Sequence, residues 1–313
     1  MTSRAFGSLV LLAAMIPAGA TAPSRPPERG QETTPIFSAR SELVVLYATV
    51  TDRDRAYVSG LTQDAFTVFE DGRPQQVQQF SVVDTPVTVG LVIDDSASMY
   101  GTRTLVAAAA GAFAATSNSD DEIFALTFNY AVRPVLPADR PFTNSAEVLR
   151  NALSMALLTQ GKTAFNDAVI AGLAYVARGV HPRKVLVVVS DGADNASTIP
   201  FERVVRETEV SNTMIYTLAI ADRADSDSRR DRLKALAVST GGQTFHPHTA
   251  GEVAHVLRRV ARDIRNTYTL GYIPSDTAAE GAFRHVRVAA RGPNGEGLTV
   301  RTRDGYVAEG RAR

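Results

Sequence analysis

The stretch Val87-Thr88-Val89-Gly90-Leu91-Val92-Ile93-Asp94-Asp95-Ser96-Ala97-Ser98-Met99 decides the fold. Its first seven residues are mostly apolar and rich in β-branched side chains, which predicts a strand buried on both faces of a parallel sheet. Asp94, Ser96 and Ser98 then follow at every second position, and a helix is predicted over residues 102–116. Open α/β sheets bind ligands beyond the carboxyl ends of their strands. Three hard oxygen atoms are therefore expected at that edge.

Strands and helices alternate on both sides of this stretch, between residues 85 and 266. Further strands are predicted at 123–128, 132–136, 184–190, 214–220 and 243–245. Further helices are predicted at 146–157, 166–178, 201–211, 229–238 and 252–264. A succession of strands joined by crossover helices predicts an α/β fold with a doubly wound, mainly parallel, Rossmann-like sheet flanked by helices.

Two β-rich segments, 37–84 and 267–309, flank the α/β segment 85–266. The first contains Asp71-Gly72, a dipeptide that favours a type I′ hairpin, followed by a return strand at 75–82. Strands are also predicted at 43–50, 57–58, 268–273, 283–290 and 298–303. Some fifty residues of strand bury too little surface to be stable alone. We therefore expect the two segments to pair into one small β-sandwich-like domain that carries the α/β domain as an insertion. Two separate β appendages are the alternative.

The N-terminus has the pattern of a secretory signal peptide. Arg4 precedes an apolar run over 6–16, and small-x-small sites end at Ala20 and Ala22. The run is shorter than the roughly 20 residues of a membrane-spanning helix, although an uncleaved anchor is the alternative. We expect a signal peptide at 1–22, a disordered leader at 23–36, a short tail at 310–313, and a periplasmic or extracellular location.

Composition removes several classes of function. The 33 basic and 33 acidic side chains cancel, and there is no basic run of the kind that binds nucleic acid. The absence of Cys excludes disulfides, thiol catalysis and thiolate metal sites.

Two further stretches place oxygen atoms at the same edge of the predicted sheet. Asp191 follows the strand at 184–190, and Thr163 ends a loop that precedes a helix. Together with Asp94, Ser96 and Ser98 they would form a cluster rich in oxygen, without His or Cys. Hard cations such as Mg²⁺ or Mn²⁺ prefer these ligands. Taken singly, a Ser or Asp after a strand is more often a helix cap, and only the combination of the three stretches favours a metal site.

The motifs closely resemble the metal-ion-dependent adhesion site of von Willebrand factor type A domains. They are Asp94-x-Ser96-x-Ser98-Met99, Gly161-x-Thr163 with Asp167-Ala168 downstream, and Ser190-Asp191-Gly192. Flanking segments look like an exported bacterial family related to these domains; they include Val50-Thr51-Asp52, Phe69-Glu70-Asp71-Gly72, 60–66, 268–274 and 300–306. The resemblance covers nearly all of the mature chain.

The resemblance implies a role for each residue of the cluster. Ser96 and Ser98 would bind the cation directly, and Thr163 directly or through water. Asp94 and Asp191 would hold coordinated waters or move into direct contact, and a carboxylate of a partner protein would complete the sphere. Ala97 stands where glycine is common in the family.

Two further carboxylates lie near the motif in the sequence. Asp167 would support the site from behind, or simply favour the start of a helix through its negative charge. Asp95 would add a carboxylate beside the site, or be a solvated loop charge.

Three functions fit this pattern. The first is a non-catalytic, divalent-metal-dependent adhesion module that captures an Asp or Glu of another protein. It would have no nucleic-acid partner and no small-molecule substrate, and it would contact a membrane only indirectly or through an uncleaved N-terminus. The second is a metal-dependent phosphoesterase, although Ser96 stands where an aspartyl-phosphate enzyme would have a second Asp. The third is a metal-free adhesive protein that acts through edge strands of the β domain.

Overall fold

The computed structural model describes residues 43–157, 161–220, 227–275 and 281–308. The predicted signal peptide, leader and tail lie outside these ranges. The chain divides into the units 1–39 and 40–313, and every described residue belongs to the second. Within the described ranges, no helix is both long and apolar enough to cross a membrane.

A six-stranded sheet forms the centre of the α/β part, in the order β10-β9-β8-β5-β6-β7. Its strands are β5 (Thr88–Asp94), β6 (Glu122–Phe128), β7 (Val132–Pro134), β8 (Lys184–Ser190), β9 (Thr213–Ala219) and β10 (Thr244–Phe245). All neighbours are parallel except β6 and β7, and β5 lies between β6 and β8. The predicted parallel sheet with an edge strand after β6 is confirmed.

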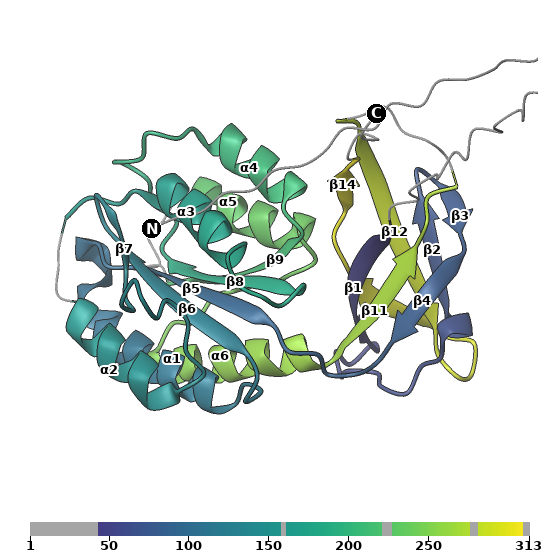
Figure 1. Cartoon of the computed structure of the whole chain (residues 1–313), viewed down its shortest axis with the longest axis horizontal. Coiled ribbons are helices and arrows are strands. Elements are labelled where there is room, and N and C mark those ends of the chain that lie inside the picture. The colour runs from purple at the N-terminus through teal and green to yellow at the C-terminus, as the bar shows by residue number, and fades with distance from the viewer. Residues whose placement is uncertain (1–42, 158–160, 221–226, 276–280, 309–313) are drawn as a thin grey trace, which may run out of the picture. The chain divides into compact units, whose positions relative to one another are not determined.

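Helices cover both faces of this sheet (Figure 1). They are α1 (Arg103–Ala115), α2 (Ala146–Ala156), α3 (Phe165–Val176), α4 (Phe201–Val210), α5 (Asp227–Ser239) and α6 (Ala250–Arg265), and a 3-10 helix η2 (Ala97–Thr102) precedes α1. One apolar core joins the sheet to α1, α2 and α6, and a second joins it to α3, α4 and α5. Every residue of β5 is buried, as its sequence predicts. Burial of one such apolar side chain contributes about 1.5–3 kcal/mol.

The strands on either side of the α/β segment pair with one another in a second sheet. Its order is β3-β2-β12-β13-β1-β11-β4, and β14 pairs with β12. The strands are β1 (Val44–Thr51), β2 (Phe66–Glu70), β3 (Arg73–Gln75), β4 (Val77–Ser81), β11 (Thr267–Tyr272), β12 (Phe283–Arg291), β13 (Gly297–Arg301) and β14 (Gly305–Val307), with a 3-10 helix η1 (Gln63–Ala65) before β2. The ends of the path, β3 and β4, are separated only by Gln76, so the sheet curls back on itself. The sandwich-like form is not confirmed by this sheet, and the domain boundaries stay a prediction.

The β strands differ from the sequence prediction in three places. Tyr57 makes only a single bridge, to Thr51, because the chain reverses at Asp52, whose Oδ1 accepts hydrogen bonds from the amides of Asp54 and Ala56 at 2.9 Å each. The predicted return strand is divided at Gln76, and β14 is additional. The predicted hairpin turn is confirmed: Asp71 and Gly72 both have positive φ, 46° and 79°, as a type I′ turn requires.

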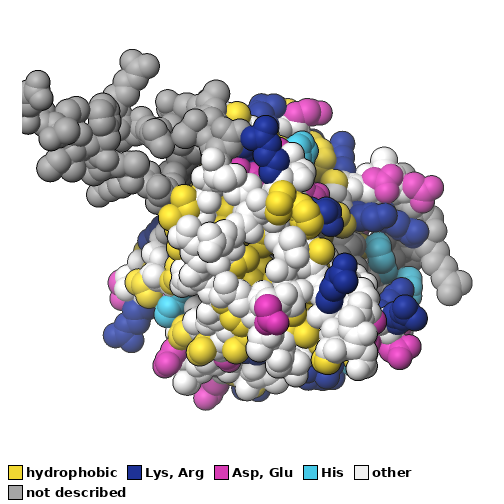
Figure 2. Space-filling view, turned by 90° about the vertical axis from the view of Figure 1, so that its right-hand side faces the viewer, with side chains coloured by type: hydrophobic (Ala, Val, Ile, Leu, Met, Phe, Trp, Pro, Cys, Tyr) yellow, Lys and Arg dark blue, Asp and Glu magenta, His cyan; other side chains and the backbone are white. Residues whose placement is uncertain are grey.

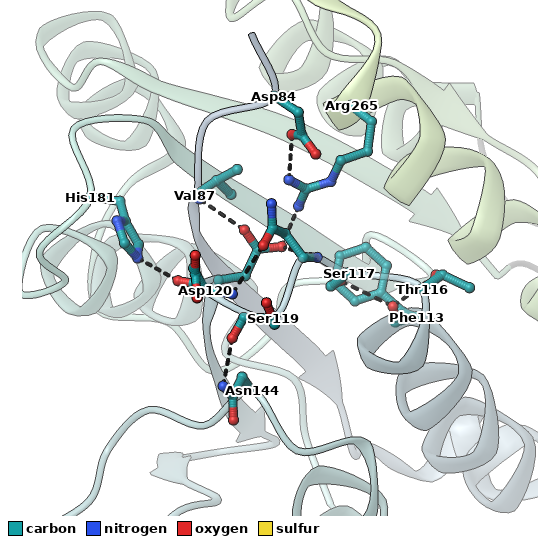
Figure 3. Close-up of polar contacts among 12 residues, drawn as sticks. Asp84, Val87, Phe113, Thr116, Ser117, Ser119, Asp120, Asn144, His181 and Arg265 are labelled. Carbon is teal, nitrogen blue, oxygen red and sulfur yellow. Dashed lines mark hydrogen bonds and ion pairs between the residues drawn. The ribbon is translucent and has the colours of Figure 1, made fainter.

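An ionic junction joins the entry and exit of the α/β segment (Figure 3). Arg265, at the end of α6, lies 2.6 Å from Asp84 Oδ1 and also pairs with Asp121. The Asp121 carboxylate accepts hydrogen bonds from the amides of Val87 and Asn118, both at 2.9 Å, and its side chain is fully buried. The junction lies at the amino end of β5, opposite the strand end that carries Asp94.

Candidate functional site

The site begins at Asp94, the last residue of β5, whose two carboxylate oxygens each accept a hydrogen bond. Asp94 is 1% exposed, its Oδ1 accepts from the amide of Ser96 at 2.9 Å, and its Oδ2 accepts from Ser190 Oγ at 2.6 Å. Ser190 is the last residue of β8, so one side chain joins the ends of two neighbouring parallel strands. This is the edge at which the sequence predicted the oxygen cluster.

The two serine hydroxyls of the motif lie side by side. Ser96 is buried, Ser98 is exposed, and their Oγ atoms are 3.1 Å apart. In an octahedral Mg²⁺ site with ligands at 2.0–2.1 Å, adjacent ligands are about 3 Å apart. The spacing of these hydroxyls therefore fits two neighbouring positions around one such cation.

Thr163 reaches the same edge through a loop that is bonded on both sides. Its amide donates to Asn195 Oδ1 at 2.8 Å, and its carbonyl oxygen accepts from the amides of Asn195 at 2.9 Å and Ala196 at 3.1 Å. The Ala97 amide donates to the carbonyl oxygen of Gly161 at 3.3 Å, so this loop is also joined to residues 95–98, which we call the serine loop. Thr163 is 3% exposed.

Asp191 follows β8 directly and is 6% exposed. Its Oδ1 accepts from the amide of Ala193 at 2.8 Å, and its Oδ2 lies 3.9 Å from Arg229 Nη1 on α5. The hydrogen bond from Ser190 to Asp94 brings this strand end to the first motif. The structure thus brings the loops that carry all five predicted residues to one edge.

The electrostatics of the edge suit a bound cation. The pKa of Asp94 is raised to about 6, chiefly by burial and to a smaller extent by the nearby charge of Asp191, while hydrogen bonds from Ser190 and Ser96 oppose the rise. A cation would relieve the cost of burying this charge. Among the described residues there is no group of three or more His, Cys, Asp or Glu side chains placed to hold a metal. The predicted donors are three hydroxyls and two carboxylates, oxygen ligands of the kind that hard cations prefer.

The two further carboxylates of the sequence analysis, Asp95 and Asp167, make other contacts. Asp95 is fully buried and its amide donates to the carbonyl oxygen of Phe128 at 2.7 Å, so the solvated-charge alternative is wrong. Asp167 lies in the first turn of α3 and its Oδ1 accepts from the amides of Thr198 at 3.1 Å and Ile199 at 2.9 Å. The Asp167 carboxylate thus contacts the loop before α4, and a role for it at the metal stays a prediction.

Sequence reasoning missed two residues that hold this site together. Ser190 was treated only as part of a motif, although its hydroxyl binds Asp94. Asn195 belongs to none of the motifs of the predicted metal site, although it binds both backbone polar groups of Thr163. The available signal was its position four residues after Asp191, in a loop that must pass the same edge.

Comparisons with known proteins agree with this architecture. The family model of the von Willebrand factor type A domain matches residues 88–259. No curated protein matches the chain.

Several solved structures are similar to the chain. A von Willebrand factor type A protein from Catenulispora acidiphila is 13% identical with a TM-score of 0.50, over 88% of this chain and 76% of that one. The vWF domain of the type V pili tip protein Mfa5 from Porphyromonas gingivalis is 13% identical with a TM-score of 0.48, over 62% and 98%. The pilus adhesin SpaC from Lactobacillus rhamnosus GG is 11% identical with a TM-score of 0.47, over 84% and 48%.

The likeness to the Catenulispora protein supports the fold alone, because the identity is low. The family match rests on the segment that contains β5, the serine loop, Thr163 and Asp191, and it spans more than half of the 313 residues. The chain belongs to the von Willebrand factor type A domain family.

Proposed function

We propose that the chain is an exported, non-catalytic protein-binding module that uses Mg²⁺ or Mn²⁺ at the carboxyl edge of its parallel sheet to capture an Asp or Glu of a partner protein. The observation that carries the proposal is the pair of hydroxyls, Ser96 Oγ and Ser98 Oγ, 3.1 Å apart beside the buried carboxylate of Asp94.

Each residue of the site has a defined task in this proposal. Ser96 and Ser98 supply neutral oxygen ligands, and Thr163 supplies a third hydroxyl. Asp94 and Asp191 supply negative charge and accept hydrogen bonds from bound water. When bound, the cation would supply a coordination position for a carboxylate oxygen of the partner, which is favourable because the hydroxyls that touch the ion directly are neutral.

The phosphoesterase alternative has less support. Both oxygens of Asp94 already accept hydrogen bonds, one from Ser96 and one from Ser190. A nucleophilic aspartate would need a second carboxylate as its acid–base partner, and position 96 is a serine.

The metal-free adhesive alternative needs a free edge or an apolar face on the β part. The sheet path ends at β3 and β4, strands of three and five residues, so the edges that another chain could pair with are short. Figure 2 shows the side at the right of Figure 1, near β2 to β4. Its hydrophobic side chains are dispersed among polar ones, and charged side chains lie mostly around the margin.

Thermal unfolding with and without metal tests the proposal. The chain without its predicted signal peptide is compared in chelator and with added Mg²⁺ or Mn²⁺. A ligand at a hundred times its Kd stabilises the folded state by about 2.7 kcal/mol, which at roughly 2–4 °C per kcal/mol corresponds to several degrees. Asp94→Ala and Ser96→Ala should abolish the shift. Ser154→Ala, which removes an exposed hydroxyl bonded to the carbonyl of Arg150 on α2, should keep it. An unchanged midpoint in the parent at saturating metal would contradict the proposal.

A further inference from the structure

The loop between β8 and α4 is bonded along its length to the segment that carries Thr163. We call residues 194–199 the clasp loop. Its first contact is Asn195, whose Oδ1 accepts from the Thr163 amide at 2.8 Å and whose own amide donates to the Thr163 carbonyl oxygen at 2.9 Å. One residue thus holds both backbone polar groups of Thr163.

The far end of the clasp loop is fixed to α3. The Asp167 carboxylate accepts from the amides of Thr198 and Ile199, and the Asp167 amide donates to Ser197 Oγ at 3.2 Å. Asn166 Nδ2 donates to the carbonyl oxygen of Ile199 at 2.9 Å. The position of Asn195 is therefore set by Asp167 and its neighbours and does not depend on the exposed loop alone.

The clasp loop begins three residues after Asp191, so it links the backbone of Asp191 to the segment that carries Thr163. Asp191 is held at the end of β8, while Thr163 enters the site on a loop outside the sheet. We infer that Asn195 is a positioning residue that fixes Thr163 relative to Asp191, so that both oxygens meet one divalent cation. The inference rests on the proposed function. It adds a reason why the oxygen atoms of Thr163 and Asp191 stay at a fixed distance from each other.

An asparagine suits this position. Its side chain provides an acceptor for the Thr163 amide, and its backbone amide remains available for the Thr163 carbonyl oxygen. Residues that orient metal ligands without touching the metal typically change metal affinity by 10–100-fold when they are replaced. Replacement of Asn195 is therefore expected to affect cation affinity more than it affects folding.

The test compares Mn²⁺ binding by the full mature chain and its variants, followed by the loss of the free-ion signal in electron paramagnetic resonance. Asn195→Leu, which removes the acceptor, should raise the Kd for Mn²⁺ 10–100-fold. Asn195→Asp, which keeps the acceptor oxygen, should restore binding to within a few-fold of the parent. Asn144→Leu is the matched control, because Asn144 is also exposed and its side chain also bonds one backbone group, the carbonyl oxygen of Ser119 at 2.6 Å (Figure 3). Asn144 follows Thr143, which bridges to Ile123 at the amino end of β6, opposite the sheet edge that carries the site.

A second readout needs no metal. Hydrogen exchange of the Thr163 amide should be slow in the parent and in Asn195→Asp, and faster in Asn195→Leu, since its acceptor is lost. If Asn195→Leu does not fold, Asn195→Ser, which shortens the side chain, takes its place in both measurements. If the parent binds no Mn²⁺, the proposed function fails, and this inference fails with it. If the parent binds and Asn195→Leu binds equally well despite faster exchange at Thr163, the positioning role alone is overturned.

Discussion

Gly90 shows how tightly individual residues are packed around the strand that carries the site. A Cβ at this position would lie 2.2 Å from Cζ of Phe124, which is fully buried in the neighbouring strand. The ring cannot move without disturbing α3 and Phe142, which contact it. Gly90→Ala should therefore lower the free energy of unfolding by about 1–3 kcal/mol, measured by urea denaturation. Gly251→Ala is the control, because nothing lies within 4 Å of the added carbon, and it should be neutral or slightly stabilising.

Ser190 gives a second prediction at the residue scale. Its hydroxyl donates to Asp94 Oδ2 at 2.6 Å and accepts from the Gly192 amide at 3.0 Å, both in a buried setting. Ser190→Ala leaves these two groups without this partner and should cost about 1–3 kcal/mol in chelator, measured by chemical denaturation. Ser154→Ala should change stability far less, because its exposed hydroxyl can be replaced by water. Equal losses in the two variants would count against a buried network at the site.

Sequence alone predicts those site residues that lie directly after buried strands. Asp94 and Asp191 follow apolar runs, so their place at the sheet edge is set by the alternation of strands and helices. The role of Asn195 could not be predicted in this way, because it depends on how one loop lies against another. The contact of the Asp95 amide with Phe128 was equally impossible to predict, since Phe128 ends β6, a strand that is distant in sequence.

At the scale of elements, the ionic junction at the end of α6 is a contact whose loss should strongly destabilise the fold. Asp121 is fully buried and pairs with Arg265, which is 18% exposed. Arg265→Ala leaves a buried carboxylate without its cation, which typically costs about 3–5 kcal/mol. Thermal or urea unfolding measures this loss. In the control, Arg203→Ala, the partner Glu207 is exposed and within one turn of α4, so at most about 1 kcal/mol should be lost.

The elements of the α/β part were predictable because their apolar periodicity is strong. Strand β8 has the predicted bounds, and α6 begins and ends within two residues of its prediction. The strands of the β part were harder to predict from the sequence, because a short strand forms only where a neighbouring strand pairs with it. β14 has only three residues and exists through its pairing with β12, and Gln76 divides a strand because its two halves pair with different neighbours.

At the scale of the whole molecule, the second sheet depends on both ends of the chain. β1 pairs with β11 on one side and with β13 on the other, and both come after the α/β segment. A chain that ends at residue 266 should expose the apolar residues of that core, among them Leu46 and Val68. We expect it to aggregate or to bind a hydrophobic dye, measured by size-exclusion chromatography and fluorescence. A chain that ends at Ala308 keeps every strand and should behave as the parent does.

The pairing of Asp84 with Arg265 bears on the order in which the molecule folds. These residues are 181 positions apart in the sequence, yet their side chains are in contact. Closing a flexible loop of that length costs about 4 to 5 kcal/mol in its length-dependent part. Once the α/β segment has folded, the junction holds the two ends of that segment together. The two halves of the second sheet then start close to each other, so little further loop-closure entropy is lost when they pair. We therefore expect the folded insert to bring the two halves of the second sheet together, so that Arg265→Ala slows refolding of this sheet in stopped-flow measurements even where the parallel sheet forms normally.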